Sequence, residues 1–280
     1  MSPRVSVVVP TYNNADFVAE TLRSILAQTF TDFELIVADH SSTDGTWEAV
    51  EQFAADSRLR MVRTPTGGGA PANWNRVTRL AQGEFVKLVC GDDLIYPDML
   101  ERQLAAVDAL GARSQDVVLV ASRRDLVDAR GDVFVRARGL GGLSGVVDGR
   151  VALRATVRSG GNLFGEPACV LMRRSALEAA GGWQDLGYYL DAGSYAPVLV
   201  QGDMIALPES LASFRVSAQQ WSVRLMREQA DAAAAFHSSA RDLVPDLISP
   251  GDVKLGNARA RLLALQRRLA YTVLGRRMRP

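Results

Sequence analysis

Two adjacent carboxylates, Asp92 and Asp93, follow the apolar segment Phe85–Val89. Neighbouring carboxylates repel one another unless a positive charge offsets them. Mg²⁺ and Mn²⁺ prefer oxygen ligands, and they complete a shell of one or two carboxylates with phosphate oxygens and water. The pair therefore indicates either a divalent-cation site or a cap for a helix that begins near Pro97. On these residues alone, both interpretations stay open.

Two further polar turns also follow apolar segments. Val5–Val9 leads into Pro10–Asn14, where the Tyr12 ring could line a nucleoside pocket. A second apolar segment ends at Asp39, whose carboxylate could accept a hydrogen bond from a base N–H or a ribose hydroxyl. Each turn alone is also typical of an ordinary connection between a strand and a helix. Three such turns at one edge of a sheet would form a ligand site.

The segment 1–120 alternates between β-branched apolar runs and apolar residues at helical spacing, which predicts strands joined by helices. This order predicts a parallel sheet with helices on both faces, and ligands of such sheets bind beyond the carboxyl ends of the strands. We expect strands at Val5–Val9, Phe33–Val37, Leu59–Val62 and Phe85–Val89, and helices at Asp16–Gln28, from Ser42 to about Phe53, and at Pro71–Ala81.

The pattern is less regular after Val117–Val120, a further expected strand. From Trp221 onward, helical spacing returns with a break at 245–251, and we place a domain boundary near Ser217. Between them we expect a hairpin at Leu126–Arg138 that turns at 130–132, a mobile loop at Gly139–Gly145, and strands at Ala168–Met172 and Leu211–Val216.

Three segments, Val5–Asn14, Ile36–Thr46 and Gly83–Pro97, resemble the N-terminal motifs of family 2 glycosyltransferases. The resemblance extends over about residues 4–220. It implies the GT-A fold, which is an α/β fold with a doubly wound, mostly parallel sheet and helices on both faces. We therefore expect a GT-A domain at 1–217, with a nucleotide-sugar-binding half at about 1–97 and an acceptor-side half at 98–217, followed by a helical C-terminal extension at 218–280.

The resemblance also implies roles for residues at matching positions. In the family, the first turn holds the nucleobase, and the acid that ends the second strand contacts the nucleoside. The last acid of a D-x-D signature holds the metal on the diphosphate. The residues at these donor-binding positions are Pro10, Thr11, Tyr12, Asn13, Asp39, Asn75, Asp92 and Asp93, with Asp92 as the ligand of Mn²⁺ or Mg²⁺.

The second half offers a candidate base. Gly181-Gly182-Trp183 precedes Asp191, and the family has a Gly-Gly-aromatic turn followed by the aspartate that deprotonates the acceptor hydroxyl. The resemblance implies this role for Asp191, and a positioned carboxylate typically contributes ~10²–10⁴-fold. Without the resemblance, Asp191 would be interpreted as an ordinary helix-capping or surface acid.

Three weaker candidates each have two interpretations. Trp183 could lie against a sugar face or in the core, and Glu166 could bind sugar hydroxyls or cap a turn. Arg215 stands where the family often places residues that close over the diphosphate, and a guanidinium suits phosphate. An arginine on an edge strand is otherwise usually solvated.

The sequence departs from the family pattern at three positions. Cys90 stands where the first acid of the D-x-D signature usually lies, His40 replaces a common acid, and Gly193 follows the base at an often acidic position. One carboxylate with diphosphate and water can still complete an octahedral shell, so Cys90 weakens metal use without excluding it. The Gln-x-x-Arg-Trp motif of processive members is missing, which favours the addition of a single sugar.

We therefore expect an inverting, non-processive transferase that moves one sugar from a nucleotide-diphosphate donor to a hydroxyl of a sugar, glycolipid or small molecule. UDP is the commonest donor nucleotide of the family. The expected products are cell-surface glycans, glycolipids or glycosylated natural products. A catalytically silent nucleotide-sugar-binding protein is the alternative, favoured by Cys90 and Gly193. A nicotinamide-dependent dehydrogenase would require a Gly-x-Gly-x-x-Gly turn after the first strand, and Pro10–Asn14 contains no glycine.

The C-terminus is basic, although the net charge is only +1. Eight of the 32 basic residues and none of the 31 acidic residues lie from Lys254 onward. A helix there could lie on an anionic membrane, or pack on the catalytic domain or a second subunit, and both interpretations stay open. Its apolar stripe would be Leu255, Ala258, Leu262, Leu265, Leu269 and Val273, with Arg261, Arg267 and Arg268 on the far side.

The sequence also indicates the cellular compartment in which we expect the protein. No apolar run reaches the ~18 residues that span a bilayer, and the N-terminus lacks the pattern of a secretory signal. Cys90 and Cys169 have no metal-ligand spacing, so we expect free thiols in a reducing cytoplasm. Peripheral contact with the inner face of the membrane is the open alternative, and we expect no nucleic-acid partner.

Overall fold

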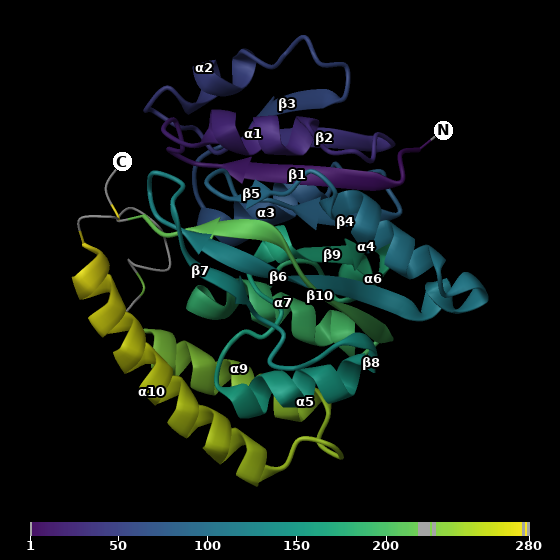
Figure 1. Cartoon of the computed structure of the whole chain (residues 1–280), viewed down its shortest axis with the longest axis vertical. Coiled ribbons are helices and arrows are strands. Elements are labelled where there is room, and N and C mark those ends of the chain that lie inside the picture. The colour runs from purple at the N-terminus through teal and green to yellow at the C-terminus, as the bar shows by residue number, and fades with distance from the viewer. Residues whose placement is uncertain (1, 218–224, 226–227, 276–277, 279–280) are drawn as a thin grey trace.

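The structure is a computed structural model that describes residues 2–217, 225, 228–275 and 278. Within this part of the chain, ten strands form one sheet in the order β3-β2-β1-β4-β9-β6-β10-β5, with β7 paired to β6 and β8 to β10. Helices pack around the sheet (Figure 1). The predicted α/β class is confirmed.

The N-terminal strands run parallel, as predicted, in the order β3-β2-β1-β4. β1 is buried along its whole length, as expected of a strand covered on both faces. Thr11 pairs with Asp39 at the carboxyl ends of β1 and β2, so the polar turns after these strands lie side by side. The elements of this half are β1 (Val5–Thr11), α1 (Val18–Leu26), β2 (Phe33–Asp39), α2 (Thr46–Glu51), β3 (Leu59–Arg63), α3 (Gly69–Thr78) and β4 (Phe85–Leu88).

The second half of the sheet is mixed. β9 runs antiparallel to both β4 and β6, whereas β10 runs parallel to β6. The predicted hairpin is confirmed, because β6 and β7 pair antiparallel around a turn in which Gly131 has a φ of 88°. The elements of this half are β5 (Leu94–Ile95), α4 (Met99–Asp108), η1 (Gly111–Asp116), β6 (Val117–Val127), β7 (Val133–Arg138), β8 (Gly145–Asp148), α5 (Gly149–Ser159), η2 (Pro167–Cys169), β9 (Val170–Arg173), α6 (Arg174–Ala179), η3 (Gly187–Tyr189), α7 (Leu190–Leu199) and β10 (Asp203–Arg215).

The region after the glycine-rich loop contains two elements that we did not predict, β8 and α5. Leu140 anchors the loop, because its side chain is fully buried and its N–H donates to the Leu163 carbonyl at 2.6 Å. Asp148 caps α5 by accepting hydrogen bonds from two main-chain N–H groups of the first turn. The helical spacing of the buried residues Ala152, Leu153 and Val157 is a signal that would have identified α5.

Two helices, α9 (Gln229–Leu243) and α10 (Pro250–Leu274), follow at the end of the molecule opposite α2 and β3 (Figure 1). Trp221, where the predicted helical pattern begins, lies outside the described residues. Asp252 is buried at the start of α10 and pairs with Arg154 at 3.1 Å and with Arg158, which fixes α10 to α5. The division into domains at 217 stays a prediction.

The side of α10 that packs against the protein differs from our prediction. Leu262, Leu265 and Leu269 are 55%, 55% and 62% exposed, so the apolar stripe forms the outer face. In the same stripe, Leu255 is half-buried, Ala258 is exposed, and the side chain of Val273 lies outside the described residues.

Small residues form the packed face instead, and they allow close approach of the helices. Ala260 and Ala264 are 4% exposed, and a Cβ on Gly256 would lie 2.2 Å from the Val157 carbonyl oxygen of α5. Arg267, which we predicted on the far side from the packed face, lies on this inner face and lines a pocket. Across the described residues, no helix combines the length and the apolar character needed to span a membrane.

Candidate active site

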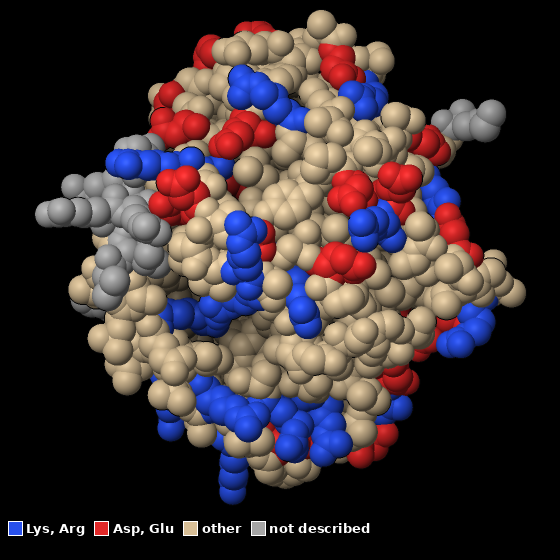
Figure 2. Space-filling model, in the orientation of Figure 1, with Lys and Arg blue, Asp and Glu red and all other residues tan. Residues whose placement is uncertain are grey.

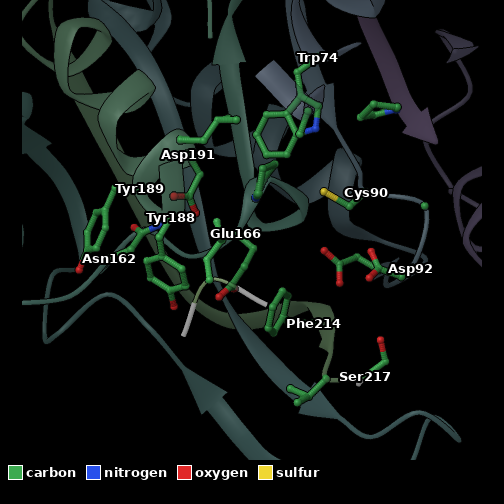
Figure 3. Close-up of a pocket in the computed structure, with 18 of the residues that line it drawn as sticks. Trp74, Cys90, Asp92, Asn162, Glu166, Tyr188, Tyr189, Asp191, Phe214 and Ser217 are labelled. Carbon is green, nitrogen blue, oxygen red and sulfur yellow. Dashed lines mark hydrogen bonds between the residues drawn. The ribbon is translucent and has the colours of Figure 1, made fainter. Parts of the chain in front are cut away.

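A pocket of about 1470 Å³ lies at the carboxyl ends of β1 and β4. Figure 3 shows Cys90 and Asp92 on one side of it and Asp191, Glu166 and Tyr188 on the other. Single small-molecule sites usually occupy about 300–1,000 Å³. The pocket therefore has room for a donor and for part of an acceptor.

The end of β1 and the turn after it line one end of the pocket with Pro10, Thr11, Tyr12 and Asn13. Tyr12 is 56% exposed, and its ring lies edge-on to the His40 ring at 6.0 Å. The turn is fixed to the turn after β2, because the Asn13 N–H donates to Ser42 Oγ at 2.9 Å and Asn13 Oδ1 accepts from the Thr43 N–H at 3.0 Å. An exposed aromatic ring on a fixed turn suits a planar ligand such as a nucleobase.

Asp39 lies behind this turn. It is 2% exposed, and its carboxylate accepts hydrogen bonds from the Ser42 N–H at 3.2 Å and from Ser42 Oγ. Thr11 Oγ1 donates to the same carboxylate at 3.4 Å. From the turn after β2, His40 lines the pocket. The nucleoside contact of Asp39 stays a prediction.

The Asp92 carboxylate is free to bind a cation. Burial raises its pKa to about 6, and its side chain accepts no hydrogen bond from any other described residue. Oxygens of Asp92 and Asp93 and the Cys90 sulfur lie within 4.8 Å of one another. Asp93 is less available, because its Oδ1 accepts from the Arg215 N–H at 3.1 Å. The arrangement fits a hard divalent cation on Asp92.

Cys90 is a poor partner in such a site. Burial raises the pKa of its thiol well above the usual value, and the charges of Asp93 and Asp92 raise it further. The thiol therefore keeps its proton, and a thiolate is the form that binds metal. Mg²⁺ and Mn²⁺ would depend on Asp92 together with oxygens from the ligand and water.

Arg215 does not occupy the predicted position over the diphosphate. It is 1% exposed, and its guanidinium donates to the carbonyls of Asp92 at 3.0 Å and Ala129 at 3.2 Å and pairs with Glu20. The guanidinium also lies 4.8 Å from the centre of the Phe17 ring. With all these contacts made inside the protein, Arg215 positions the Asp92 loop from behind.

Asn75 and Trp183 also lie outside the pocket. Asn75 Nδ2 donates to the Trp183 carbonyl at 2.8 Å, and Asn75 Oδ1 accepts from the Trp183 N–H at 2.9 Å. Trp183 is 3% exposed and donates from Nε1 to Thr78 at 2.8 Å, so of its two interpretations the core position is correct. The pocket residues of α3 include Asn73 and Trp74, which lie two positions and one position before the asparagine that we singled out.

Asp191 is held in the first turn of α7. Its Oδ2 accepts from Asn162 Nδ2 at 2.8 Å, and its Oδ1 accepts from the Ala192 N–H at 2.6 Å. Burial raises the pKa of Asp191 to about 7, and the charge of Glu166 adds to the rise. A carboxylate with this pKa can take a proton near neutral pH.

Gly193, one of the departures from the family pattern, has a packing role two residues after Asp191. It is buried in α7, and a Cβ there would lie 2.3 Å from Leu186 Cδ1. A larger side chain at this position would therefore require Leu186 to move.

Glu166 lines the pocket and forms an ion pair with Arg124. The Arg124 Nε lies 2.6 Å from Glu166 Oε2, and Nη2 donates to Oε1 at 3.0 Å. The Arg124 side chain is 5% exposed, so the pair is largely withdrawn from water. Sequence patterns did not identify Arg124, because it belongs to β6 and meets Glu166 only in the folded chain.

The C-terminal helix closes the pocket. Leu263, Arg267 and Ala270 of α10 line it together with Tyr188. Arg267 lies over the Tyr188 ring at 5.6 Å and donates to Gln229 Oε1 of α9 at 3.2 Å. Neither the resemblance nor the helical spacing indicated that a residue so close to the C-terminus would contribute to the site.

Comparisons with known proteins agree with this geometry. The sequence model described as Glycosyl transferase family 2 matches residues 6–181. Putative glycosyltransferase EpsE of Bacillus subtilis is 36% identical over 108 residues, which are 38% of this chain and 39% of that protein. Poly(ribitol-phosphate) beta-N-acetylglucosaminyltransferase TarS of Staphylococcus aureus is 36% identical over 120 residues, 42% of this chain and 20% of that relative. The matched part of the chain thus spans two fifths or less of these relatives.

Solved structures share the fold. TarS 1–349 of S. aureus in complex with UDP-GlcNAc has a TM-score of 0.66 at 18% identity, over 88% of this chain and 71% of that chain. Mannosyltransferase PcManGT from Pyrobaculum calidifontis, in complex with GDP-Man and Mn²⁺, has a TM-score of 0.61 at 22% identity, over 96% and 81% of the two chains. These similarities confirm the GT-A fold that the motifs predicted.

Proposed function

The chain belongs to glycosyl transferase family 2, and from this premise we propose that it transfers one sugar from a nucleotide-diphosphate donor to an acceptor hydroxyl, with inversion. One observation carries the proposal: Asp92 and Asp191 face the same pocket from opposite sides (Figure 3). Asp92 could bind a divalent cation that holds the diphosphate of a donor. Asp191 could accept the proton of an acceptor hydroxyl. We place the reaction in the cytoplasm, where the free thiols of Cys90 and Cys169 would stay reduced.

In this proposal the nucleoside lies against Tyr12 and Asn13, and the diphosphate extends towards Asp92. We favour UDP, because the similar TarS structure contains UDP-GlcNAc. Mn²⁺ or Mg²⁺ on Asp92 would neutralise charge on the departing diphosphate. Arg215 keeps the Asp92 loop in place through its hydrogen bond to the Asp92 carbonyl.

Asp191 acts on the acceptor. It accepts the proton of the acceptor hydroxyl while that oxygen bonds to the anomeric carbon of the donor sugar. The bond from this carbon to the phosphate oxygen breaks, and its electron pair leaves with the nucleoside diphosphate. Asn162 and the Ala192 N–H orient the carboxylate for this step. Attack from the side opposite the departing group inverts the anomeric configuration.

Calorimetry and a donor screen test the proposal. We expect UDP to bind more tightly with Mn²⁺ than without it, and one nucleotide-sugar of a panel to give the largest thermal shift, because a ligand of the folded state raises apparent stability. The same donor should be hydrolysed slowly or transferred to an acceptor. Failure of every nucleotide-sugar to bind would contradict the proposal. Metal-dependent binding without turnover on a broad acceptor panel would support the catalytically silent alternative.

We also propose that the outer face of α10 contacts an anionic membrane. The exposed residues Leu262, Leu265 and Leu269 form a stripe along this face, and the exposed Arg261 and Arg268 follow its edge at helical spacing from Leu265. An exposed apolar stripe beside basic residues is typical of helices that lie on anionic membranes. Each basic residue near such a surface contributes ~1 kcal/mol.

Flotation with vesicles tests this contact. We expect the chain to float with vesicles that contain phosphatidylglycerol and to stay unbound with pure phosphatidylcholine. The triple variant L262S/L265S/L269S should stay unbound with both, because serine removes the apolar stripe. Equal flotation of the two proteins would contradict membrane contact. A concentration-dependent dimer that the triple variant lacks would show that a second subunit covers the stripe instead.

A further inference from the structure

Three arginines line the part of the pocket near Asp191: Arg124, Arg138 and Arg267. The acids of the lining in this part of the chain are Glu166, Asp185 and Asp191. Figure 2 shows basic side chains gathered around the hollow in the lower half of the molecule, near α5, while acidic side chains lie mostly elsewhere on this face.

Glu166 forms an ion pair with only one of these arginines, and its charge acts on Arg138 and Arg267 from a longer distance. Its two carboxylate oxygens lie 2.6 Å and 3.0 Å from nitrogens of Arg124. Asp191 takes its hydrogen bonds from Asn162 and Ala192, both neutral. Among the described residues, none of the three acids forms an ion pair with Arg138 or Arg267, because Glu166 pairs with Arg124 and the exposed Asp185 pairs with neither arginine.

The contacts of the Arg267 guanidinium are with neutral groups. Arg267 donates to the Gln229 amide oxygen at 3.2 Å and lies over the Tyr188 ring. Within the described part of the chain, neither this guanidinium nor that of Arg138 forms an ion pair, and the residues outside it include no Asp or Glu. Arg138 is exposed at the edge of the pocket, and desolvation there lowers its pKa. The charge of Arg124 lowers this pKa further and that of Glu166 raises it, while the charge of Arg267 again lowers it.

An arginine cannot relieve this repulsion by losing its proton, because it stays charged in proteins. A bound anion can relieve it. Guanidinium groups bind phosphate and carboxylate oxygens through paired hydrogen bonds. The position also separates this anion from the donor, because Tyr188 and Asp191 lie across the pocket from Asp92 (Figure 3).

We propose that Arg138 and Arg267 form a subsite for a phosphate or carboxylate group of the acceptor. The inference rests on the proposed function, since it assigns the acceptor to the Asp191 side of the pocket. The acceptor then presents a hydroxyl to Asp191 and an anionic group to the two arginines. α10 thereby contributes to the choice of acceptor as well as to the wall of the pocket.

Three probes with one sugar ring test the subsite: glucose 6-phosphate, glucuronate and glucose. Binding is measured by calorimetry with UDP and Mn²⁺ present, for the wild type and for R138Q, R267Q and the double variant. We expect the wild type to bind at least one anionic probe about tenfold more tightly than glucose. The double variant should lose this preference. Comparison of the phosphate and carboxylate probes shows which group the subsite takes.

Two further variants serve as controls. R261Q removes an arginine from the outer face of the same helix and should keep the preference for anionic probes. R267K keeps the charge and should retain part of the preference, whereas loss of packing alone would affect R267K and R267Q equally. UDP affinity and thermal midpoint should be unchanged in R138Q and R267Q, which shows that the variants fold.

Three results would overturn the subsite. One is that the wild type shows no preference for anionic probes over glucose, including the case in which none of the probes binds. Another is that R261Q loses the preference as R267Q does. The third is that R138Q and R267Q weaken UDP binding as strongly as probe binding, which would assign the arginines to the donor. Failure of the proposed function can be distinguished from failure of the subsite. The first would appear as absent binding of nucleotide-sugars, whereas the second would appear as an absent preference for anionic probes.

Discussion

Replacing Asp191 by Asn is expected to stabilise the folded chain at pH 8 while it abolishes sugar transfer. Burial raises the pKa of Asp191 from an ordinary 3.8 to about 7 in the folded chain. Between these two pH values the folded chain holds a proton that the unfolded chain releases. The free energy of unfolding therefore falls as the pH rises through this window, and above pH 7 the full cost of the buried charge is present.

The magnitude follows from this shift. One pKa unit corresponds to about 1.4 kcal/mol, so a shift from 3.8 to about 7 costs at most about 4 kcal/mol above pH 7. Asn is neutral and of similar size, and it avoids this cost. Asp191 accepts one hydrogen bond from Asn162 and one from Ala192, and the side-chain amide of Asn can accept only one of them, because its NH₂ group is a donor. The loss of the other hydrogen bond costs about 1 kcal/mol. We expect a net gain of roughly 3 kcal/mol at pH 8 and almost none at pH 5.

Urea unfolding at pH 5 and pH 8 measures the difference. Asp185→Asn is the matched control, because Asp185 lines the same pocket with an exposed carboxylate and should change the stability by less than about 0.5 kcal/mol at either pH. Donor binding should persist in Asp191→Asn, and transfer should be lost. An equal stability change at both pH values, or a loss of stability at pH 8, would refute the conclusion that the buried charge of Asp191 destabilises the folded chain. Retained transfer would refute the role of Asp191 as the base.

Three other predictions concern the buried charges of Asp191, Asp92 and Lys87. The kcat/KM of the wild type should rise about tenfold per pH unit up to about pH 7 and then level off, because only ionised Asp191 accepts a proton; a flat pH–rate profile would be inconsistent with this base. Asp92→Asn should remove the effect of Mn²⁺ on UDP affinity in calorimetry, whereas the outer acid Asp98, which pairs with Arg102, should be replaceable by Asn without this loss. Lys87 is fully buried in β4, and burial lowers its pKa to about 7, so the wild type should gain stability between pH 7 and 10.5. Lys87→Met should therefore add up to about 5 kcal/mol at pH 7 and little at pH 10, and a gain independent of pH in urea unfolding would contradict the cause.

The N-terminal half was predictable because its information is local. Strands such as Val5–Thr11 are buried on both faces and appear in the sequence as continuous apolar runs. Their parallel order follows from the helices between them, and this order alone brings the turn at Tyr12 and the turn at Asp39 to one edge. The Asp92 loop follows the neighbouring strand β4, so its position near them also follows from the order of the strands.

The acceptor side was less predictable because its contacts join distant segments. Arg215 was predicted at the diphosphate from its position alone, yet Glu20 and the Ala129 carbonyl bind its guanidinium from elements far along the chain. Asn75 was assigned to the donor, but a shift of two positions along a helix moves a side chain to nearly the opposite face, and Asn73 lines the pocket instead. A motif fixes the position of a residue in the chain, and the partners of its side chain depend on the tertiary packing.

The two faces of α10 show why the sequence pattern of a helix does not identify its buried side. Apolar periodicity favoured the leucine stripe as the packed face, whereas close approach to α5 requires small residues such as Gly256. Adjacent helices pack closely only where side chains leave room, so the larger leucines remain outside. Arg267 and Leu269 are two positions apart and therefore point in nearly opposite directions. Deletion of 254–280 would remove the pocket wall and the exposed stripe together. Only substitutions on one face at a time can separate a role in acceptor binding from a role at the membrane.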